Sequence, residues 1–540
     1  MLSDFIRKKI VDLIPRTARN IAVIGSNAAD VSAEFRPYNP DCKVKLFPSI
    51  KRFVMAVQER PEVTYQTAVV LDAYANDADF HTQLTELKEH LVEGGMILTC
   101  VINPFYYQFV EQKIGKETKL SAQLLTGLME KQKTFQAQVN LLLKDTGLFF
   151  DHLFQFPNPT AQSWVTGKME EVDNNGQKLL RTMMMSFCAE RLIMRLMDHQ
   201  VPQLRIQAQV LKPVGGVNDV RIHEPLTALS SLPGVLSHAS RAEKLVVNSP
   251  TNMNKIFIWH RPILTLDEGL KHIQSLRKAG YLIITEFDDH YSPWPAIEAN
   301  KYLNFVGVHA VQTTKEELAD LFREFNPHIG VFPNQLNKMP ARDLRQASEV
   351  PNIFFGALNR QDDWKPIMPQ INEILKGVSG DFHFDVVFDK EFFDALETDK
   401  KSFAPECEYS EYLEILQKAD IALLPLQDTE FNRMKSDLKL VEVAGSGAVA
   451  IASPVVYEQT DPEAKFVEFA TNPAQFAEKL KMLIEDPEYR FERQLRGRRY
   501  VRGNRLLHHS MGARYNWIRE LLENKEILDQ ELGKRLSALS

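Results

Sequence analysis

One stretch, Ile421 to Ser453, constrains the fold of this 540-residue chain more than any other. It begins with a short apolar run that ends at Leu426, and it closes with a second one that starts at Ala448. A helical pattern lies between the two runs, opening at Ser436 and ending in glycines. Short apolar runs on either side of a helix are typical of buried parallel strands joined by a crossover. The stretch therefore predicts a strand–helix–strand unit of an α/β fold.

The residues at the start of this predicted helix indicate a ligand site. In an open parallel sheet the carboxyl ends of the strands face a crevice, and a helix N-terminus there offers free amides to an anion. Lys435 and Lys439 can neutralise a diphosphate, Ser436 can lend its amide, and Glu442 can accept hydrogen bonds from sugar or ribose hydroxyls. We therefore predict a nucleotide-sugar site. Spacing alone leaves a second interpretation open: Ser436 or Asp437 is an ordinary N-cap, the lysines lie on a solvated face, and Glu442 pairs with Lys439.

The order of these residues resembles the donor-binding half of GT-B glycosyltransferases, and in particular the retaining group of glycogen synthases and bacterial surface-polysaccharide transferases. The resemblance rests on Pro425-Leu, Phe431-Asn, the run from Lys435 to Glu442, and a strand ending in Ser453. That group often carries two glutamates eight positions apart near the donor. Glu442 matches the second, whereas Met434 stands at the first position. The sugar contact of the first glutamate is therefore expected to be absent or relocated.

A second α/β unit begins earlier, with an apolar strand at Leu204–Leu211 followed by Gly215 and Gly216. Two glycines at the end of a first strand allow the backbone to approach a ligand closely. The resemblance implies that this loop lies near the donor phosphates, and a plain turn is the alternative.

The strand at Tyr281–Phe287 leads into Asp288, Asp289 and His290, which places titratable groups at the same kind of sheet edge. The resemblance implies that Asp289 or His290 faces the acceptor, and with Glu442 these are our candidate catalytic residues. In the alternative interpretation an aspartate caps the next turn. His309 lies inside an apolar strand and is expected to be a hydrogen-bonded core histidine.

A further strand, Asn352–Gly356, ends near Arg360 and Lys365. An arginine and a lysine between a strand end and a helix start can hold a diphosphate from one side. The resemblance implies that Arg360 and Lys365 do so. The predicted donor-binding set is Gly215, Gly216, Arg360, Lys365, Lys435, Ser436, Lys439 and Glu442.

The N-terminal part has strand patterns at Arg19–Gly25, Lys43–Phe47, Thr67–Asp72 and, after a Glu93-Gly-Gly turn, at Met96–Thr99. This alternation predicts a Rossmann-like domain and resembles a class I S-adenosylmethionine methyltransferase. The cofactor signature is weak, because the first turn has a single glycine and no acid ends the second strand. A degenerate domain is therefore favoured over an active methyltransferase.

Residues from about 118 to 203 show apolar residues at helical spacing, including Met185, Leu192, Ile193 and Leu196, and predict a helical connector. We therefore expect five segments. They are a methyltransferase-like domain at 1–117, the connector at 118–203, an acceptor-side GT-B lobe at 204–340, a donor-side lobe at 341–510, and a C-terminal helix at 511–540.

Composition excludes several other classes. A net charge of −7 argues against a nucleic-acid binder, and the 44% apolar and 25% charged residues are typical of globular proteins. Four widely spaced cysteines show no zinc or redox motif, and no signal peptide or membrane span is predicted. We expect a cytoplasmic protein, and its basic run Arg493–Arg505 leaves room for weak contact with acidic lipid at the inner membrane face.

We thus expect an α/β protein with GT-B architecture that moves a sugar from a UDP-, GDP- or dTDP-type donor. The resemblance implies retention of anomeric configuration, and cationic side chains would replace a metal. No further cofactor is expected. The acceptor would be a glycan, a lipid-linked glycan or a protein. The sequence is compatible with a monomer and with a homo-oligomer. The alternatives are a methyltransferase acting on glycans and a non-catalytic GT-B scaffold. The second alternative rests on Met434, which replaces the first of the two expected glutamates.

Overall fold

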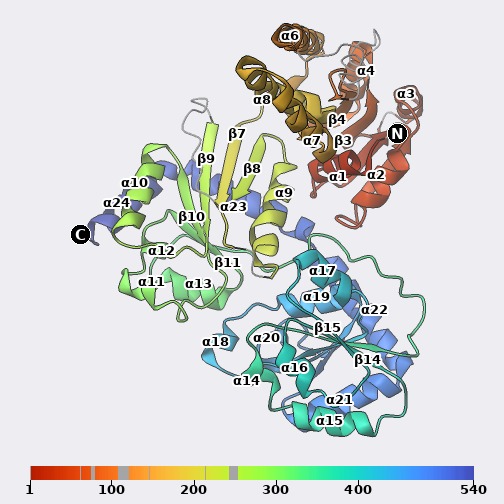
Figure 1. Ribbon diagram of the computed structural model, residues 1–540, viewed down its shortest axis with the longest axis vertical. Helices are drawn as coiled ribbons and strands as arrows, with labels where there is room; N and C mark the ends of the chain where they lie inside the picture. Colours follow the sequence, from red (N-terminus) through yellow and green to blue (C-terminus); the bar gives the residue numbers. More distant parts are fainter. Residues whose placement is uncertain are drawn as a thin grey trace. The chain divides into compact units, whose positions relative to one another are not determined.

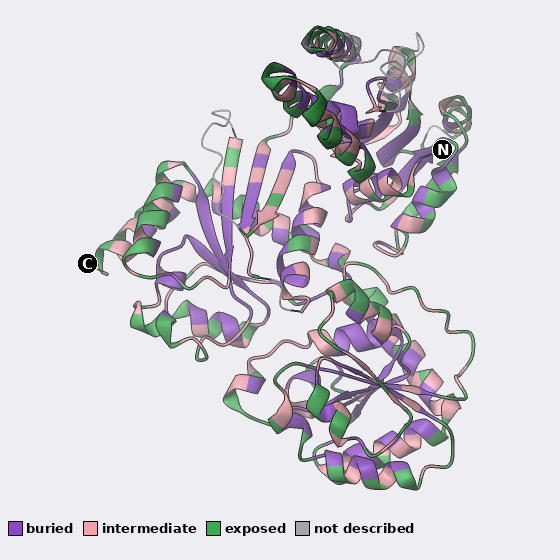
Figure 2. Cartoon of the chain, in the orientation of Figure 1, coloured by how far each residue is buried: buried purple, intermediate pink, exposed green. Residues whose placement is uncertain are grey.

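The computed structural model describes residues 2–60, 62–73, 80–107, 121–144, 146–212, 215–241 and 253–539. The chain divides into two compact units (Figure 1). The first comprises Met1–Gln203 with Ala228–Leu236, and the second comprises Leu204–Thr227 with Ser237–Ser540. The described residues form three six-stranded sheets, whose central strands are buried (Figure 2).

The first sheet has the strand order β2-β1-β3-β4-β6-β5. Its strands are β1 (Asn20–Ile24), β2 (Lys43–Phe47), β3 (Tyr65–Ala73), β4 (Leu91–Ile102), β5 (Phe149–Pro157) and β6 (Ala189–Met197). Strands β1 to β4 pair in parallel, whereas β6 runs antiparallel to both β4 and β5. The four parallel strands confirm the predicted Rossmann-like alternation in this part of the chain.

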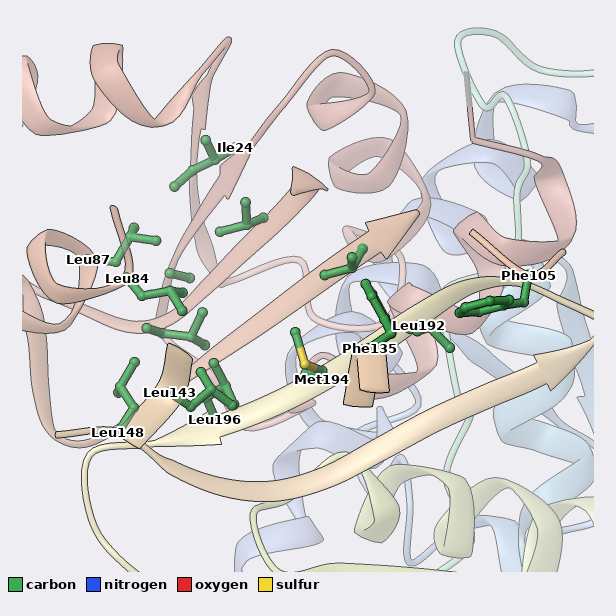
Figure 3. Close-up of a cluster of buried hydrophobic side chains, with 14 of the residues drawn as sticks. Ile24, Leu84, Leu87, Phe105, Phe135, Leu143, Leu148, Leu192, Met194 and Leu196 are labelled. Carbon is green, nitrogen blue, oxygen red and sulfur yellow. The ribbon is translucent and has the colours of Figure 1, made fainter. Parts of the chain in front are cut away.

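Helices cover both faces of the first sheet. They are α1 (Asp4–Leu13), α2 (Ala28–Phe35), α3 (Ile50–Gln58), α4 (Phe80–Glu89), α6 (Ala122–Lys144), α7 (Pro159–Lys168) and α8 (Asn174–Cys188). Because side chains alternate along a strand, Ile21 and Val23 of β1 join one core with α1 and α2, whereas Ala22 and Ile24 join the other. Figure 3 shows this second core, where Leu84 of α4 and Leu143 of α6 belong to the same cluster as Leu196.

The predicted helical connector is wrong in part, because strands β5 and β6 lie within it. β6 bonds to β4 on one side and to β5 on the other. Ile193 therefore faces one core and Leu192 and Leu196 face the other, so these residues do not form one helical stripe. A short, nearly continuous apolar run cannot by itself distinguish a buried strand from a buried helix.

The second sheet has the order β12-β11-β10-β9-β7-β8. Its strands are β7 (Gln203–Gln209), β8 (Val235–Ser240), β9 (Met253–His260), β10 (Leu282–Glu286), β11 (Ala310–Thr313) and β12 (Ile329–Val331). Strands β9 to β12 pair in parallel. The helices of this lobe are α9 (Glu224–Ser230), α10 (Glu268–Lys278), α11 (Pro295–Ala299), α12 (Leu303–Val306) and α13 (Glu316–Arg323).

The third sheet is parallel throughout, in the order β15-β14-β13-β16-β17-β18. Its strands are β13 (Asn352–Gly356), β14 (His383–Val387), β15 (Lys401–Ala404), β16 (Ile421–Leu424), β17 (Val449–Ala452) and β18 (Val467–Phe469). Its helices are α14 (Gln361–Trp364), α15 (Met368–Lys376), α16 (Lys390–Ala395), α17 (Tyr409–Leu416), α18 (Glu430–Arg433), α19 (Leu438–Ser446), α20 (Pro454–Tyr457), α21 (Pro473–Glu485) and α22 (Pro487–Asn504). The second and third sheets confirm the predicted α/β class with two Rossmann-like lobes.

The chain end returns to the lobe of the second sheet. Residues 511–540 were expected to form one helix, but they form α23 (Met511–Glu523) and α24 (Lys525–Ser537). Arg514 of α23 donates to Gln312 of β11, and Asp529 of α24 bonds to Nε2 of His309. The Nδ1 atom of His309 accepts from the backbone of Ile283. His309 is therefore the hydrogen-bonded core histidine that its sequence context predicts.

Candidate active site

A pocket of about 320 Å³ contains most of the predicted site residues. The residues of the prediction that line it are Gly215, Gly216, Asp289, Arg360, Lys435, Ser436, Lys439 and Glu442. Those on the second-sheet lobe follow β7 and β10, and those on the third-sheet lobe follow β13 and β16 or lie on α19. Strand ends of two parallel sheets thus supply one pocket, which is the usual place for a ligand in α/β folds.

Helix α19 begins two residues later than predicted, at Leu438, with Asp437 at its N-cap position. Asp437 makes no side-chain capping bond to this helix. Its carboxylate instead accepts from Arg505 and from Thr460. The ordinary N-cap interpretation of Asp437 therefore does not hold, and the preceding residues, Lys435 and Ser436, face the pocket.

Lys435 brings a largely buried ammonium group to the pocket. Its side chain is 17% exposed, and Nζ lies 3.8 Å from Oδ1 of Asp289 and 4.1 Å from the ring centre of Phe431. The pKa of Lys435 is lowered to about 8, chiefly by burial, with a contribution from the nearby Arg360 and Arg261 and with Asp289 opposing the shift. The solvated-face interpretation therefore does not hold for this lysine. An anion in the pocket would favour its charged form.

Lys439 and Glu442 lie deeper, one turn into α19. Nζ of Lys439 donates to the hydroxyl of Tyr412 at 3.1 Å, and burial lowers the pKa of this lysine. Glu442 is 2% exposed, and its two oxygens accept from the hydroxyls of Tyr409 at 2.8 Å and Tyr412 at 3.3 Å. Burial raises the pKa of Glu442, while Lys439 and the two tyrosines oppose the rise. A carboxylate has about four lone-pair sites, so Glu442 can still accept from a ligand hydroxyl.

Arg360 reaches the pocket from the end of β13. Its Nη1 atom donates to Oδ2 of Asp363 and to Oδ1 of Asn432, both at 3.1 Å. Asn432 in turn donates to Oδ1 of Asp363 at 3.1 Å. These bonds hold the guanidinium beside Lys435, whose pKa responds to it. The two side chains place two positive charges on one wall of the pocket.

The second-sheet lobe contributes two acids, Asp288 and Asp289, to the pocket. Nε of Arg261 donates to Oδ1 of Asp288 at 2.6 Å, and its Nη2 lies 3.8 Å from Asp289. Although burial raises it, the pKa of Asp288 lies well below its usual value because of Arg261. Asp288 is therefore a structural anion. Asp289, which also faces Lys435, is the better placed of the two to meet a ligand.

The glycine loop after β7 approaches the third-sheet lobe closely. A Cβ atom at Gly216 would lie 2.3 Å from the ring of Tyr409, so no larger residue fits there while the ring stays in place. Gly215 has a φ of +51°, a conformation that suits glycine, and nothing lies within 4 Å of a Cβ built there. The plain-turn interpretation is therefore incomplete, because both glycines line the pocket.

Two predicted site residues do not line this pocket. Lys365 is 55% exposed and pairs with Glu391 at 3.1 Å, because it follows α14 and lies on the outer surface. His290 is half-buried and stacks on Tyr291 with 5.0 Å between ring centres, and its Nδ1 accepts from Ser292. The sequence prediction that these two residues contact the substrates is therefore not supported by their positions.

Several lining residues were missed by the sequence analysis, among them Tyr409, Tyr412, Arg221, Asn334 and Tyr457. Tyr409 and Tyr412 lie three residues apart on α17, a spacing that also suits ordinary core packing. The signal that could have found Arg221 is its place in the short helix Asp219–His223 that follows the two glycines. Asn334 ends a Val-Phe-Pro-Asn segment that resembles one of the same family, but the sequence analysis gave it no site role.

The basic run Arg493–Arg505 is divided between contacts with the fold and solvent, because Arg496, Arg499 and Arg502 are exposed whereas Arg493, Arg498 and Arg505 are half-buried. Arg498 donates to the backbone oxygens of Gly445 and Pro340, and Arg505 pairs with Asp437. Arg493 pairs with Glu468 at 2.7 Å. Within the described part of the chain, no helix combines the length and apolar character needed to cross a bilayer.

The first turn of the N-terminal domain is closed by an acid. Both the amide and the hydroxyl of Ser26 donate to Oδ2 of Asp72, at 2.7 and 2.9 Å. A Cβ at Gly25 would lie 2.8 Å from the same oxygen. The exposed carboxylate of Asp72 therefore places a negative charge at this turn, which disfavours an anionic ligand there.

Comparison with known families matches residues 370–519 to the model of a glycosyl transferase-like domain. The matched interval contains strands β14 to β18 and all of α19, and so includes Lys435, Lys439 and Glu442. A comparison with curated protein sequences gave no match.

Solved structures with a similar course of the chain include TarM from S. aureus in complex with UDP, at 11% sequence identity and a TM-score of 0.37. The match covers 49% of this chain and 55% of TarM, so the chain spans about half the length of TarM. HepE from Anabaena with UDP and glucose is 12% identical, with a TM-score of 0.41 and coverage of 60% and 100%. A trehalose 6-phosphate synthase from Burkholderia multivorans is 8% identical, with a TM-score of 0.41 and coverage of 61% and 99%.

Proposed function

We propose, from the premise that this chain is a glycosyltransferase of the GT-B fold, that it moves a sugar from a nucleoside diphosphate to a hydroxyl-bearing acceptor. The observation that carries the proposal is the joining of Lys435, Lys439 and Arg360 in one pocket with Asp289, whose carboxylate lies 3.8 Å from Lys435. The match of residues 370–519 to the glycosyl transferase-like model supports it, since that interval supplies both lysines.

In this proposal the cationic wall binds the leaving diphosphate. The bond between the anomeric carbon and the phosphate oxygen breaks, a bond from that carbon to the acceptor oxygen forms, and the proton of the acceptor hydroxyl passes to the leaving diphosphate. Lys435 and Arg360 stabilise the charge that develops on the phosphate. Glu442 accepts hydrogen bonds from sugar or ribose hydroxyls, and Asp289 accepts one from the acceptor. His290 and Lys365 receive no role.

Retention of configuration and independence of metal ions belong to the same proposal. The two cationic side chains beside the pocket carry the charge that a divalent ion would otherwise supply. A transfer assay in the presence of EDTA tests the second point, because an activity that EDTA abolishes and Mg²⁺ or Mn²⁺ restores would contradict it. Proton NMR of the product tests the first through its anomeric coupling.

The first experiment is a panel of UDP-, GDP- and dTDP-linked sugars, with release of the nucleoside diphosphate as the readout. At least one donor should release its diphosphate, slowly to water and faster with an acceptor. Glycans, lipid-linked glycans and proteins of the bacterial cell surface form the acceptor panel. Tight binding of a donor without any turnover would instead favour a non-catalytic scaffold.

For the N-terminal domain we propose a non-catalytic role, because Asp72 already occupies the turn that a cofactor would approach. Calorimetry with S-adenosylmethionine should show no heat of binding, and a clear one-to-one isotherm would revive the methyltransferase alternative. We also propose a cytoplasmic location, since all four cysteines carry free thiols.

A further inference from the structure

A buried arginine, Arg221, holds residues 332–334, which follow β12, in place. Arg221 is 1% exposed and binds both oxygens of Glu286, at 2.8 and 3.1 Å. Its Nη1 atom also donates to the backbone oxygen of Phe332 and to Oδ1 of Asn334, both at 2.8 Å. A guanidinium held by this many bonds has one orientation, so the atoms facing it are fixed as well.

This anchor determines which way the amide of Asn334 points. Arginine has only hydrogen-bond donors, so the Asn334 atom that faces Arg221 must be its oxygen. The amide nitrogen therefore faces the other way, toward Oγ of Ser436, and donates to it at 2.8 Å. Asn334 is 3% exposed, and Arg505 donates to its backbone oxygen at 2.8 Å. Neither the side chain nor its peptide group is free to turn.

The hydroxyl of Ser436 is consequently forced to be an acceptor on this side. An amide NH₂ cannot accept, so the proton of the hydroxyl has to point elsewhere. Ser436 lines the pocket between Lys435 and Lys439, and its hydroxyl donates to no other group within the described residues. Its free proton is thus available to an acceptor atom in the pocket.

We propose that Asn334 is a positioning residue that sets the polarity of the Ser436 hydroxyl, so that this hydroxyl donates to an oxygen of the donor diphosphate. The inference rests on the proposed function and deepens it. The second-sheet lobe, through Glu286, Arg221 and Asn334, thereby prepares an anion contact on the third-sheet lobe. It also gives the buried Arg221–Glu286 ion pair an effect on donor affinity.

A double-mutant cycle tests the relay. Affinity for UDP, GDP and dTDP is measured by calorimetry for the wild type, Asn334→Ala, Ser436→Ala and the double variant. Each single variant should weaken binding of the preferred diphosphate by about tenfold, the size expected for one charge-assisted hydrogen bond. The double variant should be no weaker than Ser436→Ala, because both changes cut the same contact. Multiplicative effects in the double variant would overturn the inference.

An isosteric variant guards against a folding defect. Asn334→Asp keeps the shape of the side chain and its bond to Arg221. It turns an oxygen toward Ser436, however, so the serine hydroxyl donates its hydrogen bond to this carboxylate and not to a ligand in the pocket. It should weaken diphosphate binding more than Asn334→Ala while leaving the melting temperature unchanged. Unchanged or tighter binding would contradict the polarity argument.

The matched control is Asn372→Ala, which removes a buried asparagine outside the pocket. The amide of Asn372 donates to Ala395 at 2.9 Å, and the residue is 7% exposed. Its loss should leave diphosphate affinity unchanged. Failure of the wild type to bind any of the three diphosphates would overturn the proposed function and this inference together. Binding by the wild type with an unchanged affinity in both single variants would overturn the inference alone.

Discussion

The first and third sheets present opposite chemistry at the strand ends where α/β proteins bind ligands. After β1 of the first sheet, the carboxylate of Asp72 accepts hydrogen bonds from the amide and the hydroxyl of Ser26. After β16 of the third sheet, Lys435, Ser436 and Lys439 face a pocket. Both regions lead from the end of a parallel strand into a helix, β1 directly into α2 and β16 by way of α18 into α19, so the fold alone does not decide which one binds an anion. The sign of the nearby charge does.

The largest effect is expected from the cationic residues of the pocket, Lys435, Lys439 and Arg360. Lys435→Ala should lower kcat/KM for transfer by about 100-fold, because it removes a desolvated positive charge from the leaving diphosphate. Lys365→Ala is the matched control, since that lysine is exposed and paired with Glu391. Equal effects of the two substitutions would show that position in the pocket does not matter, and the comparison between the sheets would fail.

The next largest effect is expected from Glu442, the buried carboxylate of the same pocket. Glu442→Gln should lower kcat/KM by about tenfold, because a neutral amide accepts hydrogen bonds from sugar or ribose hydroxyls less well. It should also lower the melting temperature, since Lys439 would be left buried without its counter-charge. A lower melting temperature with unchanged kinetics would assign Glu442 to the fold alone.

A smaller effect is expected from pH. Burial lowers the pKa of Lys435 to about 8, and a bound diphosphate should raise it again. The contribution of this lysine to binding is then complete below pH 8 and is lost as the pH rises through the pKa of the bound state. Affinity for the diphosphate should fall between pH 7.5 and 9.5, with proton uptake seen by calorimetry in buffers of different ionisation enthalpy. Lys435→Arg, which stays charged in this range, should remove the uptake.

The smallest effect belongs to the first sheet. Asp72→Ala should leave sugar transfer unchanged, because the residue lies in the other compact unit and not in the pocket. It should cost only a little stability, since its two bonds to Ser26 are exposed to solvent. A loss of transfer in this variant would mean that the N-terminal domain takes part in the reaction.

The sequence alone was sufficient for the strands on either side of α19 and for most of the predicted pocket residues. The stretch Ile421 to Ser453 folds as predicted into β16, α19 and β17, because its apolar runs and small-residue turn agree with one another. Asp289, Arg360 and the two glycines also reach the pocket.

Other features depend on contacts that spacing does not encode. The direction of Lys365 is set by α14 and by Glu391, and the stack of His290 on Tyr291 holds that ring outside the lining residues. Tyr409 is brought to Glu442 from a helix more than thirty positions earlier in the chain. Strands β5 and β6 were taken for helix, because an apolar run of that length fits either structure.

The most direct test of the account is a calorimetric titration of the whole chain and of Lys435→Ala with UDP, GDP and dTDP at pH 7.5. The account predicts a one-to-one isotherm for at least one of the three with the unmodified chain, and a loss of most of that affinity in the variant. No binding of any diphosphate, or equal binding by both proteins, would contradict it.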